Sequence, residues 1–167
     1  MPLIILLRPK EDADSSCGTG QFGDDRIDGG AGNDTLDGGE GTDTLEFGFA
    51  SEGVEIDLRD DTSTGEGDDI VAGFEHVLGT EHADTIHGDH GPNTLLGGAG
   101  ADRLFAHDGR DVVKAGGGAD LASGQSGNDD VGGGKGRDQL DGGDGKDRCK
   151  GGPDPDSFVF CERIRLD

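Results

Sequence analysis

The chain lacks Trp and Tyr, and only 29% of its 167 residues are hydrophobic. Such a small apolar fraction excludes a large hydrophobic core, and together with a net charge of −23 it is typical of a disordered acidic chain. Basic residues are also scarce, with 14 Lys and Arg against 37 Asp and Glu. Because phosphate binding requires basic patches, we expect no nucleic-acid partner.

Long apolar runs are absent as well. No stretch reaches the length of about 18 apolar residues that a transmembrane helix needs, so we expect no membrane span. The apolar run at residues 3–7 is too short for the core of a signal peptide, and no small-residue cleavage site follows it. We expect residues 1–19 to form an N-terminal cap or polar leader, with a short strand at the apolar run.

Glycine is abundant, with 35 residues, and it recurs with a period of nine. Twelve units of the form G-G-x-G-x-D-x-U-x, in which U is apolar, cover residues 20–46 (three units) and 79–159 (nine units). Positions one and four are Gly in ten units each, and the exceptions are Ala106, Ala115, His82 and Asp154. A period that holds in several columns indicates a repeat architecture rather than disorder.

Position six carries a side-chain oxygen in every unit, and position eight, from Ile27 to Phe158, carries a residue that can lie in an apolar interior. The position-six residues are Asp25, Asp34, Asp43, Asp84, Asn93, Asp102, Asp111, Asp120, Asp129, Asp138, Asp147 and Asp156. A disordered acidic chain would not require an apolar residue two places after each of them. We therefore treat these twelve residues as the candidate ligands of a cation.

Each unit divides into a Gly-rich turn and a short strand. The first six residues suit a tight turn, and the last three can form one strand with the middle side chain inward. Two units bring the chain round once, so that strands of successive 18-residue coils stack about 4.8 Å apart. We expect an all-β fold, a β-solenoid of stacked 18-residue coils.

The expected stacking makes position-six residues 18 apart into neighbours. Two carboxylates about 5 Å apart repel by roughly 3 kcal/mol at an effective dielectric near 20, and a divalent cation between them reverses the sign. Calcium accepts six to eight oxygen ligands in loose geometry, whereas magnesium is stricter and zinc prefers nitrogen and sulfur. Counting the pairs predicts about eight Ca²⁺ ions.

Residues 47–78 break the period, and we expect an irregular insert with short strands there. Val54, Ile56 and Leu58 alternate with acidic residues, which indicates a half-buried strand. Residues 64–72 resemble a degenerate unit, with Gly, Asp and an apolar residue in the expected columns.

Residues 160–167 follow the last unit, and we expect them to form a C-terminal cap, because solenoids need their open ends covered. Phe158 and Phe160 are the residues that we expect to plug this end.

Several units, such as GGAGNDTLD (29–37), GGAGADRLF (97–105) and GGKGRDQLD (133–141), match the nonapeptide pattern in full. In these residues the chain resembles the RTX (repeats-in-toxin, haemolysin-type) family. The resemblance implies a parallel β-roll, calcium held by the position-six Asp and by carbonyls of positions one to four, and secretion followed by folding in extracellular calcium. The segment GFEHVLGT (73–80) resembles one that leads into such repeats.

No catalytic pattern is found, neither HExxH nor GxSxG, so we expect no enzyme activity in these residues. The favoured function is calcium binding by a secreted β-roll that folds on binding Ca²⁺ outside the cell. One alternative is a calcium-dependent module appended to a secreted enzyme (an epimerase, lipase or protease), with a fused catalytic domain as partner. Another is a surface adhesin or polysaccharide-binding module, for which Thr35, Thr44, Thr85 and Thr94 at position seven are a weak indication.

Three Cys and five His leave further alternatives open. Cys149 occupies an apolar column, where it is either a small buried residue or the partner of Cys161 in a disulfide that fastens the tail. Cys17 would then be left over. The His residues all lie between 76 and 107 but in different columns, which favours polar loop residues over a transition-metal site.

Overall fold

The described residues form strands that belong to three sheets. The computed structural model describes residues 4–6, 17–48 and 50–165. Sheet 1 contains, in spatial order, β1 (Ile4–Leu6), β3 (Arg26–Asp28), β5 (Thr44–Glu46), β9 (His76–Leu78), β11 (Thr94–Ala99), β14 (Val112–Gly117), β17 (Asp130–Lys135), β20 (Arg148–Lys150) and β22 (Arg163–Arg165). Sheet 2 contains β2 (Cys17–Thr19), β4 (Thr35–Asp37), β8 (Asp68–Ala72), β7 (Thr62–Thr64), β6 (Glu55–Asp57), β10 (Thr85–His87), β12 (Arg103–Phe105), β15 (Leu121–Ser123), β18 (Gln139–Asp141) and β21 (Ser157–Val159). A small third sheet is made of β13 (Asp108–Gly109), β16 (Ser126–Gly127) and β19 (Asp144–Gly145) along one row of turns.

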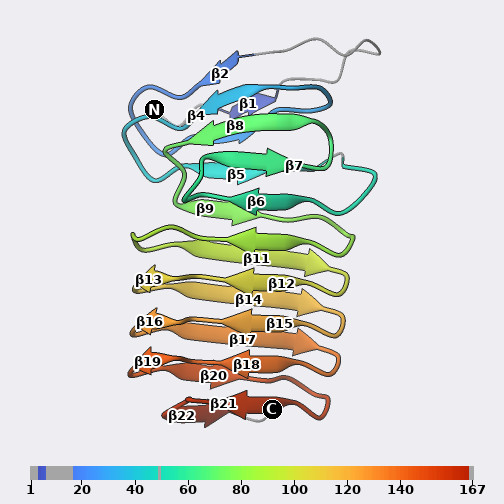
Figure 1. Cartoon of the computed structure of the whole chain (residues 1–167), viewed down its shortest axis with the longest axis vertical. Coiled ribbons are helices and arrows are strands. Elements are labelled where there is room, and N and C mark those ends of the chain that lie inside the picture. Colours follow the sequence, from blue (N-terminus) through green and yellow to red (C-terminus); the bar gives the residue numbers. More distant parts are fainter. Residues whose placement is uncertain (1–3, 7–16, 49, 166–167) are drawn as a thin grey trace.

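Successive units of the chain alternate between sheet 1 and sheet 2, and the coils stack along one axis (Figure 1). Strands pair in parallel with residues 18 apart, as in Ile86 with Leu104 and Leu95 with Val113. The predicted all-β parallel β-roll with 18-residue coils is therefore confirmed. Among the residues that the structure describes, none forms a helix with the length and apolarity that a membrane crossing requires.

The core between the two large sheets is thin and consists mainly of position-eight side chains. Position-eight side chains point inward from both sheets, and every one from Ile27 to Cys149 is buried. Ala106 and Ala115, the two exceptions at position one, are also fully buried in this core. Fully burying a Leu or Val side chain contributes about 1.5–3 kcal/mol, so each unit adds little apolar stabilisation of its own.

The insert changes the number of strands in one sheet. Between β4 and β10, sheet 2 contains three strands (β8, β7 and β6), whereas sheet 1 contains one, β9, between β5 and β11. The middle strand β7 is antiparallel to both neighbours. Two additional strands lengthen this side by roughly 10 Å. The large buried side chains Phe47 and Phe74 lie in the core of this region, where the repeats offer nothing larger than Leu or Ile.

Residues 64–72 form a complete unit within the insert. Leu36 pairs with Val71 in parallel register, as position eight pairs with position eight elsewhere. The backbone N–H of Asp34 donates to Oδ1 of Asp69 at 2.9 Å, so that Asp69 lies in the position-six column. The sequence pattern of this degenerate unit is thus matched by its register.

Two further units are shortened to six residues. In the full repeats, position one of a unit lies against the carbonyl of position one in the next coil. Gly73 and Phe160 take the same place, because a Cβ on Gly38 would lie 2.0 Å from the carbonyl oxygen of Gly73, and one on Gly142 would lie 2.2 Å from that of Phe160. From Gly73 and from Phe160 the chain reaches β9 and β22 after three residues, instead of the six that separate Gly79 from β10. Residues 73–78 and 160–165 are therefore equivalent units of six residues, which we call the shortened coils.

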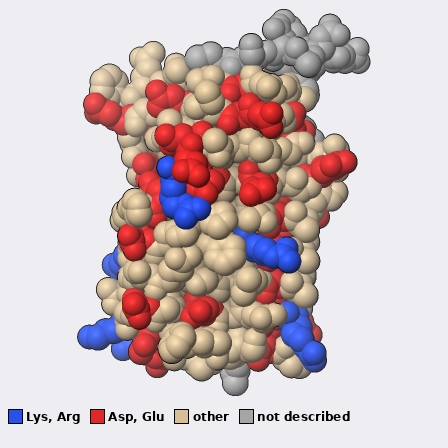
Figure 2. All heavy atoms as spheres, viewed as in Figure 1, with Lys and Arg blue, Asp and Glu red and all other residues tan. Residues whose placement is uncertain are grey.

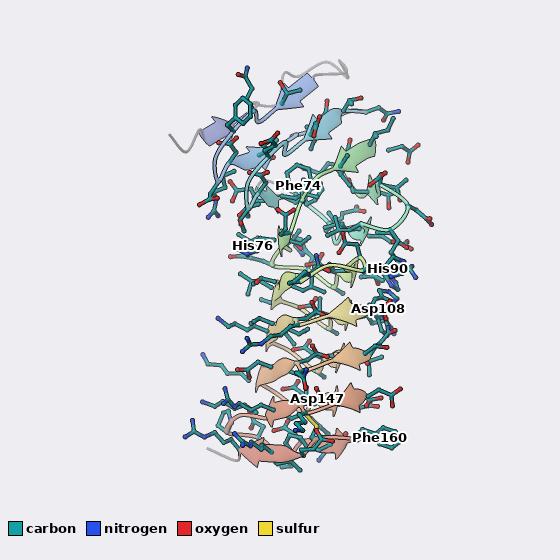
Figure 3. The ribbon with its side chains drawn as sticks, turned by 90° about the vertical axis from the view of Figure 1, so that its left-hand side faces the viewer. Phe74, His76, His90, Asp108, Asp147 and Phe160 are labelled. Carbon is teal, nitrogen blue, oxygen red and sulfur yellow. A yellow bond between two sulfur atoms is a disulfide. The ribbon has the colours of Figure 1, made fainter. Side chains whose placement is uncertain are left out.

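The C-terminal end is fastened by a disulfide. Cys149, which is fully buried, is bonded to Cys161, with a Cα–Cα distance of 5.9 Å. Phe158 packs partly buried against the core, but Phe160 is 70% exposed and points away from the end of the roll (Figure 3). The prediction that Phe160 plugs this end is wrong, because the chain turns at Phe160, whose φ is 49°, and Cys161 packs against the core in its place.

The core predicts a large difference between two neighbouring residues of β12. Leu104→Ala should lower the free energy of unfolding in calcium by about 2–5 kcal/mol, because the side chains of the thin core cannot move to fill the cavity that it leaves. Arg103→Ala, at an exposed position, is the matched control and should change it by less than about 0.5 kcal/mol. Urea denaturation measures both, and equal effects would contradict this description of the core.

Candidate metal site in the stacked turns

The turns bring the predicted position-six residues into columns. One column contains Asp84, Asp102, Asp120, Asp138 and Asp156, and the other contains Asn93, Asp111, Asp129 and Asp147. Upstream, Asp25 lies next to Asp43, and Asp34 lies next to Asp69. All of them are buried except Asp156, which is half-buried in the last complete unit. Each directly precedes a strand, except Asp69, which lies within β8, so the sheet register fixes its place.

A hydrogen bond connects each member of a column to the next. The backbone N–H of Asp102 donates to Oδ1 of Asp120 at 2.9 Å, and the backbone N–H of Asp111 donates to Oδ1 of Asp129 at the same distance. The same bond, at 2.7–3.1 Å, recurs from Asp25 to Asp43 and along both columns. One oxygen of each carboxylate thus has an amide partner, which the sequence pattern did not reveal.

Two residues outside the repeats continue these columns. Oε2 of Glu75 accepts from the N–H of Asp43 at 2.8 Å, and Oε2 of Glu162 accepts from the N–H of Asp147 at 2.6 Å. Both belong to the shortened coils, where a side chain one methylene longer than Asp replaces the missing turn. Sequence reasoning missed them, although each is an acidic residue two places before an apolar one, as in the repeat.

The second carboxylate oxygen, Oδ2, which we call the inner oxygen, is left open in eight units. It is buried and accepts no hydrogen bond from any described residue in Asp43, Asp102, Asp111, Asp120, Asp129, Asp138, Asp147 and Asp156. It faces position one of its own turn, since a Cβ on Gly97 would lie 2.5 Å from Oδ2 of Asp102. A buried charged oxygen without a partner is costly, so a positive group in these turns would offset that cost.

Burial changes the acidity of these carboxyls. It raises the pKa of Asp102 to about 7, and the negative charges of Asp84 and Asp120 add to this shift. The hydrogen bond from the N–H of Asp84 acts in the opposite direction and lowers the pKa. It also raises the pKa of Asp111 to about 7. Burial is the largest cause of the raised pKa in Asp120, Asp129 and Asp138 as well. The two columns are therefore rows of carboxylates deprived of water.

The turns with an open inner oxygen share one backbone feature. Their position-two residue has a left-handed φ, and this holds even where it is not Gly, as in His107 (72°) and Gln125 (67°).

Three of the remaining turns use position two differently. The N–H of Thr80 donates to Oδ2 of Asp84 at 2.7 Å, and the N–H of Asp89 donates to Oδ1 of Asn93 at 2.8 Å. Likewise, the N–H of Gln21 lies 3.3 Å from Oδ2 of Asp25. In these three turns an amide occupies the place that is open in the eight others.

The donor set of the open turns fits a hard cation. The atoms of these turns that can act as metal ligands are carboxylate and peptide oxygens, which calcium prefers, and no thiolate is among them. In the described part of the chain no three His, Cys, Asp or Glu side chains gather closely enough to hold a metal by themselves. Backbone carbonyls of the Gly-rich turns would therefore have to complete the coordination shell, as the loose geometry of calcium allows.

The His residues pair in a way that their columns did not suggest. Nδ1 of His87 lies 3.1 Å from Nε2 of His107, with the rings stacked, and Nδ1 of His90 lies 2.9 Å from a carboxylate oxygen of Asp108. His90 and Asp108 lie on an outer edge of the roll (Figure 3). Burial lowers the pKa of both His87 and His107.

A comparison with protein families agrees with this geometry. Four copies of the RTX calcium-binding nonapeptide repeat match the chain, at residues 19–49, 78–113, 106–140 and 123–158. These matches cover more than half of the chain, which therefore belongs to the RTX calcium-binding repeat family. The repeats form a structural calcium-binding β-roll, and Ca²⁺ is their ion. No curated protein matches the chain.

The raised pKa values predict how the metal-free roll responds to pH. In the fold Asp102 and Asp111 have a pKa of about 7, above the ordinary value of 3.8, so the fold binds more protons than the unfolded chain between these values. Stability without metal should therefore be greatest below about pH 4 and should fall as the pH rises to about 7. Urea denaturation in a chelator across this range measures it, and a stability that rises with pH would contradict the burial of these carboxylates.

Proposed function

We propose that the position-six carboxylates with open inner oxygens hold Ca²⁺ between successive turns, and that the roll folds on binding Ca²⁺ outside the cell. One observation carries this proposal: eight buried inner oxygens that lack any N–H donor, arranged in columns along the turns. A bound cation supplies the positive charge that these oxygens lack. The remaining oxygen of each carboxylate is already fixed by the amide of the preceding coil, so the site is oriented by the backbone.

Folding and binding are coupled in this proposal. The thin core gives each coil little apolar stabilisation, and the buried carboxylates oppose stacking. Ligand that binds the folded state alone stabilises it by about 2.7 kcal/mol at a hundred times Kd. Because each ion contacts two coils, binding of one ion orders the turn that the next ion needs, and the transition should be steep.

One feature supports an extracellular setting, where free calcium is also abundant enough to fill weak sites. The Cys149–Cys161 disulfide is a bond that persists in oxidising compartments. Inside a cell, calcium is scarce and disulfides are reduced, so the C-terminal coils would lack both the bound ions and the bond that stabilise them.

Removing one inner oxygen tests the proposed ligands. Asp120 belongs to two pairs, with Asp102 and with Asp138. Asp120→Asn should lower the calcium stoichiometry by about two ions and raise the calcium concentration needed for folding, because an amide nitrogen takes the place of an anionic oxygen. Asp144→Asn removes the same charge from an exposed turn residue and is the matched control. Calorimetry and circular dichroism measure both, and unchanged stoichiometry in the Asp120 variant would refute its role.

A groove on sheet 1 favours a second candidate function, binding of an anionic polysaccharide. The groove has a volume of about 800 Å³, crosses β11, β14, β17 and β20, and has Lys114, Lys135 and Lys150 among its lining residues. Ten of the fourteen Lys and Arg residues lie between 103 and 165. Figure 2 shows Asp and Glu gathered over the N-terminal part of the face in view. The part of the roll from residue 103 onward is therefore less acidic than the part before it.

Two glycines keep the floor of this groove open. Gly117 and Gly132 occupy the variable positions three and nine, and neither has a left-handed φ. A Cβ on Gly117 would meet nothing within 4 Å, and one on Gly132 would make an ordinary contact at 3.6 Å. The fold does not need Gly at these two places, and larger residues there would fill the space between the lysines.

Substitution of the three lysines tests this second function. Lys114→Gln, Lys135→Gln and Lys150→Gln together should weaken binding of a soluble uronate or sulfated oligosaccharide about tenfold in calcium, since each exposed ion pair contributes about 0.2–1 kcal/mol. Arg103→Gln, Arg110→Gln and Arg137→Gln together remove the same charge elsewhere. Calorimetry with a neutral glucan as the blank distinguishes the two, and equal losses in both triple variants would mean that net charge alone is responsible.

A further inference from the structure

The two turns that begin the second run of repeats, at residues 79–84 and 88–93, have a local hydrogen-bond pattern of their own. The hydroxyl of Thr80 accepts from the N–H of His82 at 2.9 Å, and the carboxylate of Asp89 accepts from the N–H of Gly91 at 2.7 Å. Such side-chain to backbone bonds two residues on are characteristic of Ser, Thr and Asp in turns. Position four has no left-handed φ here, which explains why His82 is accommodated where other units have Gly.

This pattern leaves no room for a cation at Asp84. Its Oδ1 accepts from the N–H of Val54 at 2.8 Å, and its Oδ2 accepts from the N–H of Thr80 at 2.7 Å. A trans peptide points its N–H and C=O in opposite directions, so the carbonyl before Thr80 faces away from the carboxylate. The turn therefore presents an amide hydrogen where the open turns can present oxygen.

The neighbouring position-six residues in the middle of the roll are satisfied in the same way. Asp69 accepts from the N–H of Asp34 at 2.9 Å and from the hydroxyl of Ser63 at 2.9 Å. Asn93 carries no charge, and its Oδ1 accepts from the N–H of Asp89 at 2.8 Å. None of the three side chains needs a bound ion to offset its burial.

The same region has the larger core. Residues 53–96 contain β6 to β10 and the first half of β11, including the antiparallel strands β6, β7 and β8, which pair locally in sequence. They bury Val54, Ile56, Leu58 and Phe74 in addition to the position-eight residues. Local pairing and a larger apolar core are the features that allow a segment to fold on its own interactions.

From these contacts we infer that residues 53–96, the metal-free segment, hold no calcium and fold without it, and that the calcium-binding coils 97–159 assemble on its exposed strand edges when calcium is present. This inference rests on the proposed calcium function for the coils that follow. It reduces the expected ions in the second run to five, one for each pair with two open inner oxygens. The pairs are Asp102–Asp120, Asp120–Asp138, Asp138–Asp156, Asp111–Asp129 and Asp129–Asp147.

Hydrogen exchange of the full chain, in a chelator and in calcium, tests the inference. Backbone amides of 53–96 should be protected under both conditions, whereas amides of 97–159 should gain protection in calcium alone. Loss of protection at 53–96 in the chelator overturns the inference, even if calcium restores the whole roll. If calcium leaves 97–159 unchanged, the proposed calcium function fails together with the calcium-driven assembly of these coils, whereas the protection of 53–96 in the chelator still decides whether this segment folds without metal.

Substitutions at the two turns give an independent test. Asp84→Asn should leave the calcium stoichiometry unchanged, whereas Asp102→Asn should lower it. Replacing Thr80 and Asp89 by Gly and Asn93 by Asp should open both turns and raise the stoichiometry by up to two ions, through pairing with Asp102 and Asp111. Glu81→Gly, at an exposed position of the same turn, is the control. A loss of ions in Asp84→Asn would overturn the inference.

Discussion

The structure depends on carboxylates that are buried in rows without water. One oxygen of each is bonded to an amide of the neighbouring coil, and the other, in most turns, has no protein partner. The parallel sheets, the glycines of the turns and the thin apolar layer all keep this arrangement in register. In our proposal bound Ca²⁺ supplies the charge that completes this arrangement in the coils with open oxygens, since the burial of so many anions is costly.

Much of the fold follows from the sequence because the repeat constrains it. Position eight, as in Leu104, defines the core, and position six, as in Asp102, defines the columns. The coil has 18 residues because it contains two units, each with one short strand. The shortened coils were not predictable in this way. Glu75 and Glu162 lie outside the nonapeptide pattern, and their role depends on three missing residues whose effect is visible only in the register of the strands.

The candidate site was predicted as a set of equivalent residues, and the structure separates them. Asp84 and Asp102 occupy the same column and the same position of the pattern, yet the first has two N–H partners and the second has an open oxygen. The difference arises at position two, where Thr80 forms a local turn that Gly98 does not. The sequence contained this signal as a deviation from Gly, but its effect on a carboxylate four residues later required the backbone geometry.

The two six-residue coils have a consequence for how such a chain can change in length. Each ends a column by presenting a Glu to the last amide, whatever the number of full coils that come before it. A whole coil can therefore be gained or lost between the insert and residues 160–165 without altering either boundary. Growth of the roll in evolution needs the duplication of eighteen codons and no redesign of its terminus.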